Sequence, residues 1–110
     1  MINAIDFKAE QVKLLLTGLI SQTVLGYDDD TMKLQSGMVI PISFEGELFR
    51  NYLLKIKDIR ITSIRKLSNK DIFLNGFLYK PHFVNYMKLR GFNPDDTILR
   101  INFELIKCNE

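Results

Sequence analysis

The apolar alternation in the middle of the chain changes phase once, and this change constrains the fold more than any other feature. Leu54 and Ile56 occupy alternate positions, as in a strand with one buried face. Beyond Asp58 the apolar positions move by one residue, to Ile59 and Ile61. A bulge or bend near Asp58 would return both halves of the strand to a common face. Because such phase changes occur where strands curl, the pattern predicts a small barrel instead of a doubly wound parallel sheet.

The flanking patterns predict further strands and short helices. Asp6 is the expected N-cap, and Gly18 the expected stop, of a helix over residues 8–17. Ser68 and Lys80 would begin two later helices, which end at Gly76 and Gly91. Strands are expected at residues 2–7, 21–27 and 38–44, from residue 48 through the phase change, and at residues 99–105. The fold class is therefore α+β.

The final strand alternates cleanly between two kinds of side chain. One face is expected to be dry and the other to be solvated. The apolar residues are Leu99, Ile101, Phe103 and Leu105, and the polar ones are Arg100, Asn102 and Glu104.

Length and composition exclude several classes of protein. The 110 residues suit one domain, residues 1–110, and no apolar run approaches the roughly 20 residues that cross a bilayer. With no signal-peptide pattern, a cytoplasmic location is the default expectation. One cysteine, Cys108, and one histidine, His82, cannot form an internal disulfide or a Cys/His metal cluster, and the consecutive carboxylates of Asp28 to Asp30 lack the spacing of a calcium loop. We expect no metal and no cofactor.

Positive charge is concentrated in one segment. Residues 50–70 hold seven cations and one anion, Asp58, a local excess of six. Such a row suits phosphate groups, since each neutralised phosphate releases counterions. A solvated strand face protected by lysines against edge pairing explains the row equally well. The cations are Arg50, Lys55, Lys57, Arg60, Arg65, Lys66 and Lys70.

Several short motifs, in a common order over about 90 residues, resemble the ASCH family of small PUA-like domains. Gly18, Ser21 and Thr23 match the glycine and two polar positions of its pattern close to G-x-K-T-x-T/E-x-R, and Gln22 fits its common forms. The segments that resemble its later elements are Leu34-Gln35-Ser36-Gly37-Met38-Val39-Ile40, Leu67-Ser68-Asn69-Lys70-Asp71-Ile72, Asn75-Gly76-Phe77, Phe83-Val84-Asn85-Tyr86-Met87 and Ile101-Asn102-Phe103-Glu104-Leu105. The resemblance implies a PUA-like β pseudo-barrel with flanking short helices, and an association with RNA or modified nucleosides.

The chain departs from this family at its charged positions. Some members hydrolyse acetylcytidine with a lysine, a threonine and a glutamate, but here Ile20 stands at the lysine position and Leu25 at the arginine position. Only Thr23 remains as a weak catalytic candidate, because a hydroxyl without a neighbouring base is a poor nucleophile. A residual acetylcytidine-type amidohydrolase would need an ionisable group beside Thr23, and the candidates are Lys33, Lys80, Glu47 and His82.

Two other hypotheses need no catalysis. In the first, the chain is a module that binds RNA or a nucleotide, with Ser21, Gln22 and Thr23 facing the cleft and Lys55, Lys57, Arg60 and Arg65 contacting phosphate. Tyr52, Tyr79 or Phe92 would offer a stacking ring. In the second, the chain is an accessory module of phage or mobile-element type that binds a protein, and it would expose an apolar patch around Leu19, Ile20 and Leu25.

Overall fold

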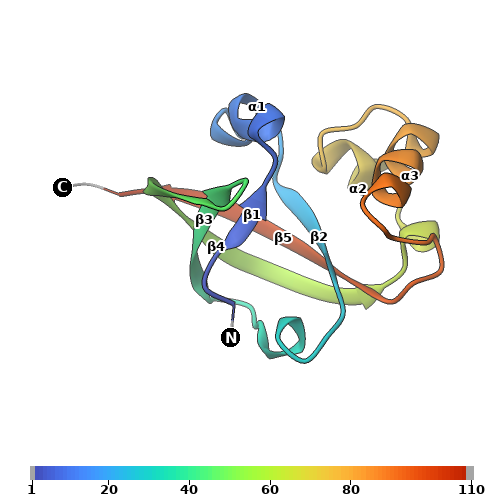
Figure 1. Cartoon of the computed structure of the whole chain (residues 1–110), viewed down its shortest axis with the longest axis horizontal. Coiled ribbons are helices and arrows are strands. Elements are labelled where there is room, and N and C mark those ends of the chain that lie inside the picture. Colours follow the sequence, from blue (N-terminus) through green and yellow to red (C-terminus); the bar gives the residue numbers. More distant parts are fainter. Residues whose placement is uncertain (1, 109–110) are drawn as a thin grey trace.

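A single sheet in the strand order β1-β3-β4-β5-β2 organises the computed structural model, which describes residues 2–108 (Figure 1). β1 pairs in parallel with β3, and every other neighbouring pair is antiparallel. The long strands β4 and β5 form the centre of the sheet. The strand bounds are β1 (Ile5–Phe7), β2 (Gln22–Gly26), β3 (Val39–Phe44), β4 (Glu47–Thr62) and β5 (Ile98–Lys107).

The sheet curls around a main apolar core. Its two edge strands, β1 and β2, come close enough to line one cleft together, through Phe7 and Val24 among others. The α+β barrel expected from the phase change is therefore confirmed. The buried core residues come from β1, β3, β4 and β5, from α1 (Val12–Leu16) and from Ile20, which precedes β2: Ile5, Phe7, Leu15, Ile20, Ile40, Ile42, Leu54, Ile56, Leu99, Ile101 and Phe103.

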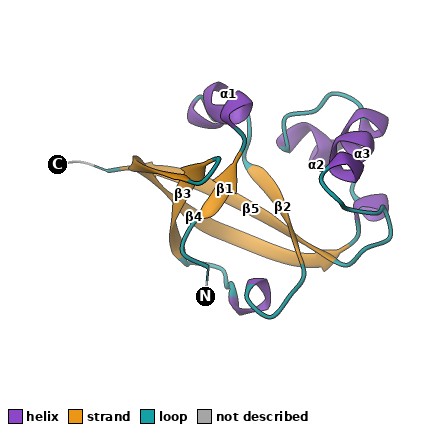
Figure 2. Cartoon of the chain, in the orientation of Figure 1, coloured by secondary structure: helices purple, strands orange, loops and turns teal. Residues whose placement is uncertain are grey.

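A second core lies on the other side of β2 and β5. Helices α2 (Asn69–Leu74) and α3 (Lys80–Leu89) cover this side (Figure 2). Val24 and Ile98 extend into it from the sheet, so β2 and β5 are buried on both faces. The other members of this core are Ile64, Leu67, Ile72, Phe83 and Met87.

The predicted bulge lies one residue before Asp58. Ile56 pairs with Phe103 and Asp58 pairs with Asn102, which leaves Lys57 without a partner position on β5. Lys55 and Arg60, five residues apart, would lie on opposite faces of a regular strand. The extra residue places both of them on the face that carries Glu104 and Arg100, their register partners.

Turn and cap residues explain where the helices begin and end. α1 ends at Gly18, whose φ of +81° permits the Leu19 amide to donate to the Leu14 carbonyl at 2.9 Å. Ser68 caps α2 by accepting from the Asp71 amide at 3.1 Å. The expectation for Asp6 was wrong. It lies in β1, where its carboxylate accepts from the Ser43 hydroxyl and the Gly46 amide, and the predicted helix is divided into a 3₁₀ turn (Ala9–Gln11) and α1.

Candidate nucleic-acid interface

The polar face of β5 is covered, contrary to the sequence prediction. Arg100 is buried and Asn102 is half-buried, because α2 and α3 pack over this side of the strand. The alternation identified the two faces correctly, but it did not reveal that the polar one has a cover. Only Glu104, farther along the strand, is exposed as expected.

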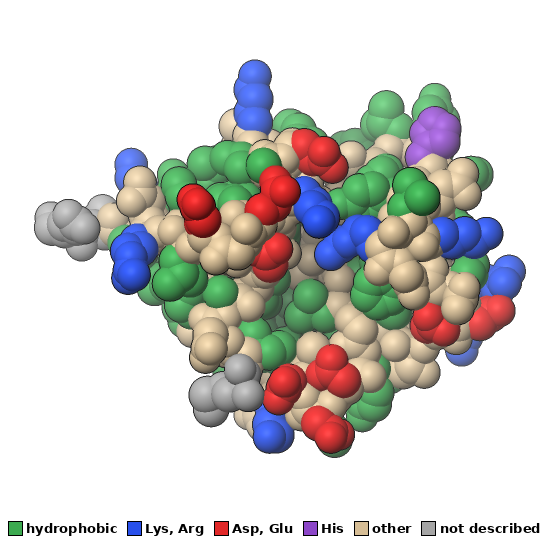
Figure 3. All heavy atoms as spheres, viewed as in Figure 1, with side chains coloured by type: hydrophobic (Ala, Val, Ile, Leu, Met, Phe, Trp, Pro, Cys, Tyr) green, Lys and Arg blue, Asp and Glu red, His purple; other side chains and the backbone are tan. Residues whose placement is uncertain are grey.

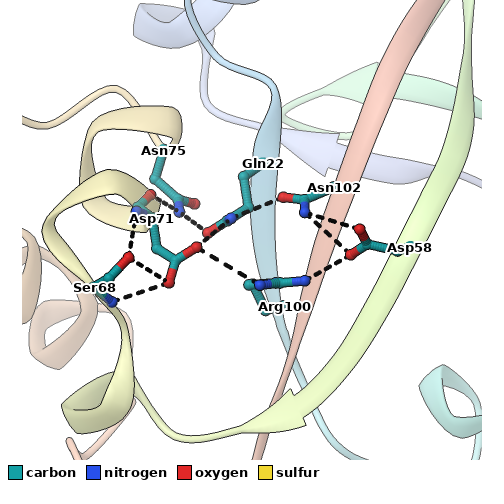
Figure 4. Close-up of polar contacts among 7 residues, drawn as sticks. All are labelled: Gln22, Asp58, Ser68, Asp71, Asn75, Arg100 and Asn102. Carbon is teal, nitrogen blue, oxygen red and sulfur yellow. Dashed lines mark hydrogen bonds and ion pairs between the residues drawn. The ribbon is translucent and has the colours of Figure 1, made fainter.

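Gln22 is the centre of a polar network between the sheet and α2 (Figure 4). Its side-chain amide donates to Asp71 Oδ1 at 2.9 Å and to Asn102 Oδ1 at 2.8 Å. Its carbonyl accepts from Asn75 Nδ2 at 2.7 Å. The Gln22 side chain is 1% exposed and both amide hydrogens are used, so it has no free donor for a ligand.

Two carboxylates flank the buried Arg100 guanidinium. Nη2 lies 2.6 Å from Asp58 Oδ1, and Nη1 lies 3.8 Å from Asp71 Oδ1. Burial alone would raise the pKa of Asp71. The hydrogen bonds from Gln22 and Ser68, together with the Arg100 charge, outweigh that effect and hold the pKa below 3.8. The network therefore fixes α2 against the sheet with paired charges.

The polar residues of the motif, Ser21, Gln22 and Thr23, lie in two different environments. Gln22 and Thr23 line a narrow cleft, the Thr23 cleft, between the sheet edges and α3, together with Asn75, Tyr86 and Arg90. This cleft has a volume of about 20 Å³. Such a space accommodates about one water molecule, whereas small-molecule pockets occupy roughly 300–1,000 Å³. A nucleoside does not fit there.

None of the four predicted ionisable partners lines the Thr23 cleft. The Lys80 ammonium group donates to the carbonyls of Arg65 and Leu67, and the exposed His82 ring packs edge-on against Tyr79. No hydrogen bond joins the Thr23 side chain to another residue in the range 2–108.

The residues that replace the charged motif positions are structural. Ile20 is 3% exposed and belongs to the main core, and Leu25 is half-buried against that core. Gly76, at the end of α2, packs so closely on Ile20 that an added Cβ would lie 3.0 Å from its Cγ1. An apolar side chain at position 20 thus supports the contact between β2 and α2.

Ser21 lines a broader groove, which we call the β4 groove, with a volume of about 450 Å³. Its walls are the end of α1 and the strands β4 and β5. Lys57, the extra residue of the bulge, lies in this groove together with Tyr52 and Glu104. The remaining lining residues are Leu15, Leu16, Thr17, Gly18, Ile20, Phe103 and Leu105.

The predicted cations differ in their availability. Lys55, Lys57 and Arg60 are exposed and make no hydrogen bond or ion pair with the residues that the structure describes. Arg65 is engaged with Asp95, at 2.6 Å from Nε to Oδ1. On the face shown in Figure 3, acidic and basic side chains are interspersed. β4 therefore carries a local group of free cations, and other exposed cations, among them Lys33, Lys88 and Lys107, lie elsewhere on the chain.

The three candidate stacking rings also differ. Tyr52 is half-buried beside Lys57 in the β4 groove and stacks on Phe49, with ring centroids 5.9 Å apart and planes 7° apart. Tyr79 is 62% exposed but packs against His82, and Phe92 supports the second core next to Gly26. Tyr52 is the ring that the structure brings together with a predicted cation.

An exposed apolar patch lies at the other side of α1. Leu19, Phe73 and Leu78 are 56%, 55% and 78% exposed and border a recess of about 160 Å³. Of the three residues predicted for such a patch, only Leu19 belongs to it.

Solved structures with a similar fold include the three described next, whereas no family model and no curated protein matches the sequence. Protein EF3133 of Enterococcus faecalis V583 superposes with a TM-score of 0.71 at 15% identity, covering 97% of this chain and 82% of that chain. The hypothetical protein PH0355 gives 0.74 at 19% identity, with coverages of 94% and 97%. An ASCH domain from Lactobacillus crispatus JV V101 gives 0.62 at 14% identity, with coverages of 96% and 81%.

The chain has the ASCH-domain fold. The resemblance noted from the sequence motifs is therefore confirmed at the level of the fold, including its PUA-like architecture. Residues 2–108 contain no group of three or more His, Cys, Asp or Glu side chains placed to hold a metal ion. The described helices are all too short or too polar to cross a membrane.

Proposed function

We propose that this ASCH-fold chain is a non-catalytic module that binds RNA or a nucleotide at the β4 groove. The observation that carries the proposal is the shared location of Ser21, Tyr52 and Lys57 in one groove of about 450 Å³. This volume lies within the usual range of ligand sites, unlike that of the Thr23 cleft. The interface thus differs from the nucleoside cleft that the family resemblance implies.

Each of these side chains suits a different part of a nucleotide. The ammonium group of Lys57 attracts phosphate, and the hydroxyl of Ser21 can donate to phosphate or sugar oxygens. The Tyr52 ring offers a surface for an unpaired base. Lys55 and Arg60 add positive charge on the opposite face of β4, where the bulge places both of them, and neither lines the groove.

The binding proposal accounts for the loss of charged motif residues. With Ile20 in the core, and with no hydrogen bond from Thr23 to the Asp6 or Arg90 side chains that also line its cleft, the geometry gives no support to an amidohydrolase. We expect the purified protein to release no cytidine from acetylcytidine. Catalytic release that disappears in a Thr23→Val variant would overturn this part of the proposal.

The direct test compares short single-stranded and duplex RNA and DNA at low and moderate salt. We expect salt-sensitive binding that a Lys57→Ala/Arg60→Ala double variant weakens. Each lost phosphate contact lowers the log–log salt slope by about 0.7 for single strands. The matched control is a Lys33→Ala/Lys88→Ala double variant, which removes the same charge from exposed sites outside β4. Absence of binding at low salt would overturn the proposal.

A second candidate function, protein binding, is favoured by the apolar patch of Leu19, Phe73 and Leu78. Exposed apolar side chains that border a recess are typical of interaction sites. This candidate predicts a partner whose complex with the chain is lost in a Leu19→Ser/Leu78→Ser variant and kept in the Lys57→Ala/Arg60→Ala variant. A complex that the Leu19→Ser/Leu78→Ser variant keeps and the Lys57→Ala/Arg60→Ala variant loses would instead place the partner on β4.

A further inference from the structure

Tyr52 belongs to two neighbouring hollows. It lines the β4 groove, and it also lines a smaller recess of about 190 Å³ that we call the Arg50 recess. The ring therefore forms a wall between them. The other residues of the Arg50 recess are Pro41, Leu48, Phe49, Arg50 and Leu53, so its lining is apolar apart from one guanidinium group.

A second irregularity in β4 creates this recess. Pro41 pairs with Leu53 and the next residue of β3, Ile42, pairs with Phe49, so residues 50–52 lie outside the ladder with β3. The interruption brings the Phe49 ring onto Tyr52 and leaves Arg50 exposed. Each of the two irregularities in β4 thus leaves one cation outside the regular ladder, Arg50 at the first and Lys57 at the second.

Positive charge continues on both sides of the Tyr52 ring. Lys107 of β5 is the register partner of Tyr52 and is exposed. Arg50 lies in the recess and Lys57 in the groove, and neither has an ion-pair partner among residues 2–108. A ring with a half-buried body and surrounding free cations suits a base whose neighbouring phosphates lie to either side.

The length of this track distinguishes between ligands. From Arg50 to Lys57 the strand advances seven residues, which span at most about 23 Å at roughly 3.3 Å per residue, because its two irregularities shorten the path. Phosphates along one strand are spaced about 3.4 Å per nucleotide, so fewer than about seven nucleotides cover the distance. A free nucleotide, with its phosphates at one position, can reach only one of the two cations.

We infer that the ligand of this surface is a single-stranded nucleic-acid segment of about four to six nucleotides, with one base against Tyr52 and phosphates at Arg50 and Lys57. The inference rests on the proposed function and narrows it, because it excludes the free nucleotide as the natural ligand. It also excludes a duplex, whose paired bases cannot turn onto the ring.

The test measures dissociation constants for uridine monophosphate and for oligouridylates of two, four, six and eight nucleotides at low salt. We expect affinity to rise at least tenfold from the monophosphate to the hexamer and then to change little. Replacing Tyr52 by Leu should weaken hexamer binding roughly tenfold, the typical effect of losing one base–aromatic contact. Tyr52→Phe keeps the ring and should bind as the wild type does, which separates stacking from folding. Tyr79→Leu is the control at an exposed ring outside the track.

The outcomes separate this inference from the proposed function. Equal affinity for the monophosphate and the hexamer, with Tyr52→Leu and Arg50→Gln both unchanged, would overturn the inference and leave the module intact. Failure of every probe to bind would overturn the proposed function itself. Loss of binding in Arg50→Gln, a change at an exposed position that keeps the fold, would support the track even where Tyr52→Leu is unstable.

Discussion

Arg100 Nη2 and Asp58 Oδ1 lie 2.6 Å apart across the β4–β5 ladder, and only the arginine is buried: the side chains are 9% and 56% exposed. The register places Arg60 directly opposite Arg100, so two like charges share this part of the sheet. Like charges in this position are destabilising unless a third group compensates. Asp58 supplies that compensation from the solvent side.

Replacing Asp58 by Asn should therefore lower the free energy of unfolding by about 1–3 kcal/mol, because the buried guanidinium loses its closest charged acceptor. The matched control is Asp95→Asn. It breaks the Arg65 ion pair, whose side chains are 65% and 73% exposed, and should cost about 1 kcal/mol or less. Urea unfolding of both variants measures the difference, and equal losses would show that burial of Arg100 has no energetic weight.

Gln22→Leu keeps the volume of the side chain and removes all its hydrogen bonds. Asp71, Asn102 and Asn75 each lose a partner in a covered site, so we expect a loss of about 2–4 kcal/mol in unfolding free energy. Gln35→Leu, at an exposed position, should change stability by about 0.5 kcal/mol or less. An unchanged free energy of unfolding in Gln22→Leu would mean that Asp71, Asn102 and Asn75 can find other hydrogen-bond partners.

Asp71 should make stability depend on acid pH. The hydrogen bonds and the Arg100 charge around it lower its pKa in the folded chain from the value of an unfolded aspartate, about 3.9. A lowered folded pKa stabilises the chain above the unfolded value, and this contribution is lost as the pH falls through the folded one. Between pH 5 and pH 2, Asp71→Asn should show a shallower loss of stability than the wild type in urea unfolding. If the free energy of unfolding falls equally with pH in the wild type and in Asp71→Asn, other carboxylates cause the acid sensitivity.

Gly76→Ala and Gly37→Ala separate backbone strain from steric contact. Both glycines have φ near +90°, where an L side chain costs about 1–2 kcal/mol. An added Cβ at Gly37 meets nothing within 4 Å, but at Gly76 it approaches Ile20. We expect Gly76→Ala to be the more destabilising by about 1 kcal/mol or more in thermal or urea unfolding. A smaller loss for Gly76→Ala in an Ile20→Ala background, which removes Cγ1, would identify the contact, whereas equal losses for the single variants Gly76→Ala and Gly37→Ala would contradict it.

The sequence predicted the order of elements and the bulge because both depend on local signals. Apolar spacing located the strands, glycines with positive φ ended the helices, and the phase change before Ile59 marked the extra residue. Asp6 was misassigned because an acidic residue before an apolar run also suits a strand whose carboxylate accepts from another turn. Nothing local distinguishes the two arrangements.

The polar network could not be predicted in the same way. Alternation in β5 separates Arg100 and Asn102 from the apolar residues, but the partner element determines whether a face is covered. One signal was present: Ile98 lies on the same face as Arg100, and an apolar residue on a solvated face indicates packing. The separation of Ser21 from Thr23 likewise depends on how α1 and α3 border β2. The roles of Ser21, Thr23, Lys55, Lys57, Arg60 and Arg65 in ligand binding stay predictions.

The bulge at Lys57 determines which side chains of the second half of β4 face the core. If the same residues were paired in a regular ladder, the portion of β4 after Ile56 would be turned over, so that Ile59 would face away from the core while Asp58 and Arg60 faced it. Deleting Lys57 would leave a regular alternation in which Ile56 and Ile59 still face the core, so what the insertion adds is the lysine itself. The bulge thus leaves one lysine outside the ladder, where it lines the β4 groove.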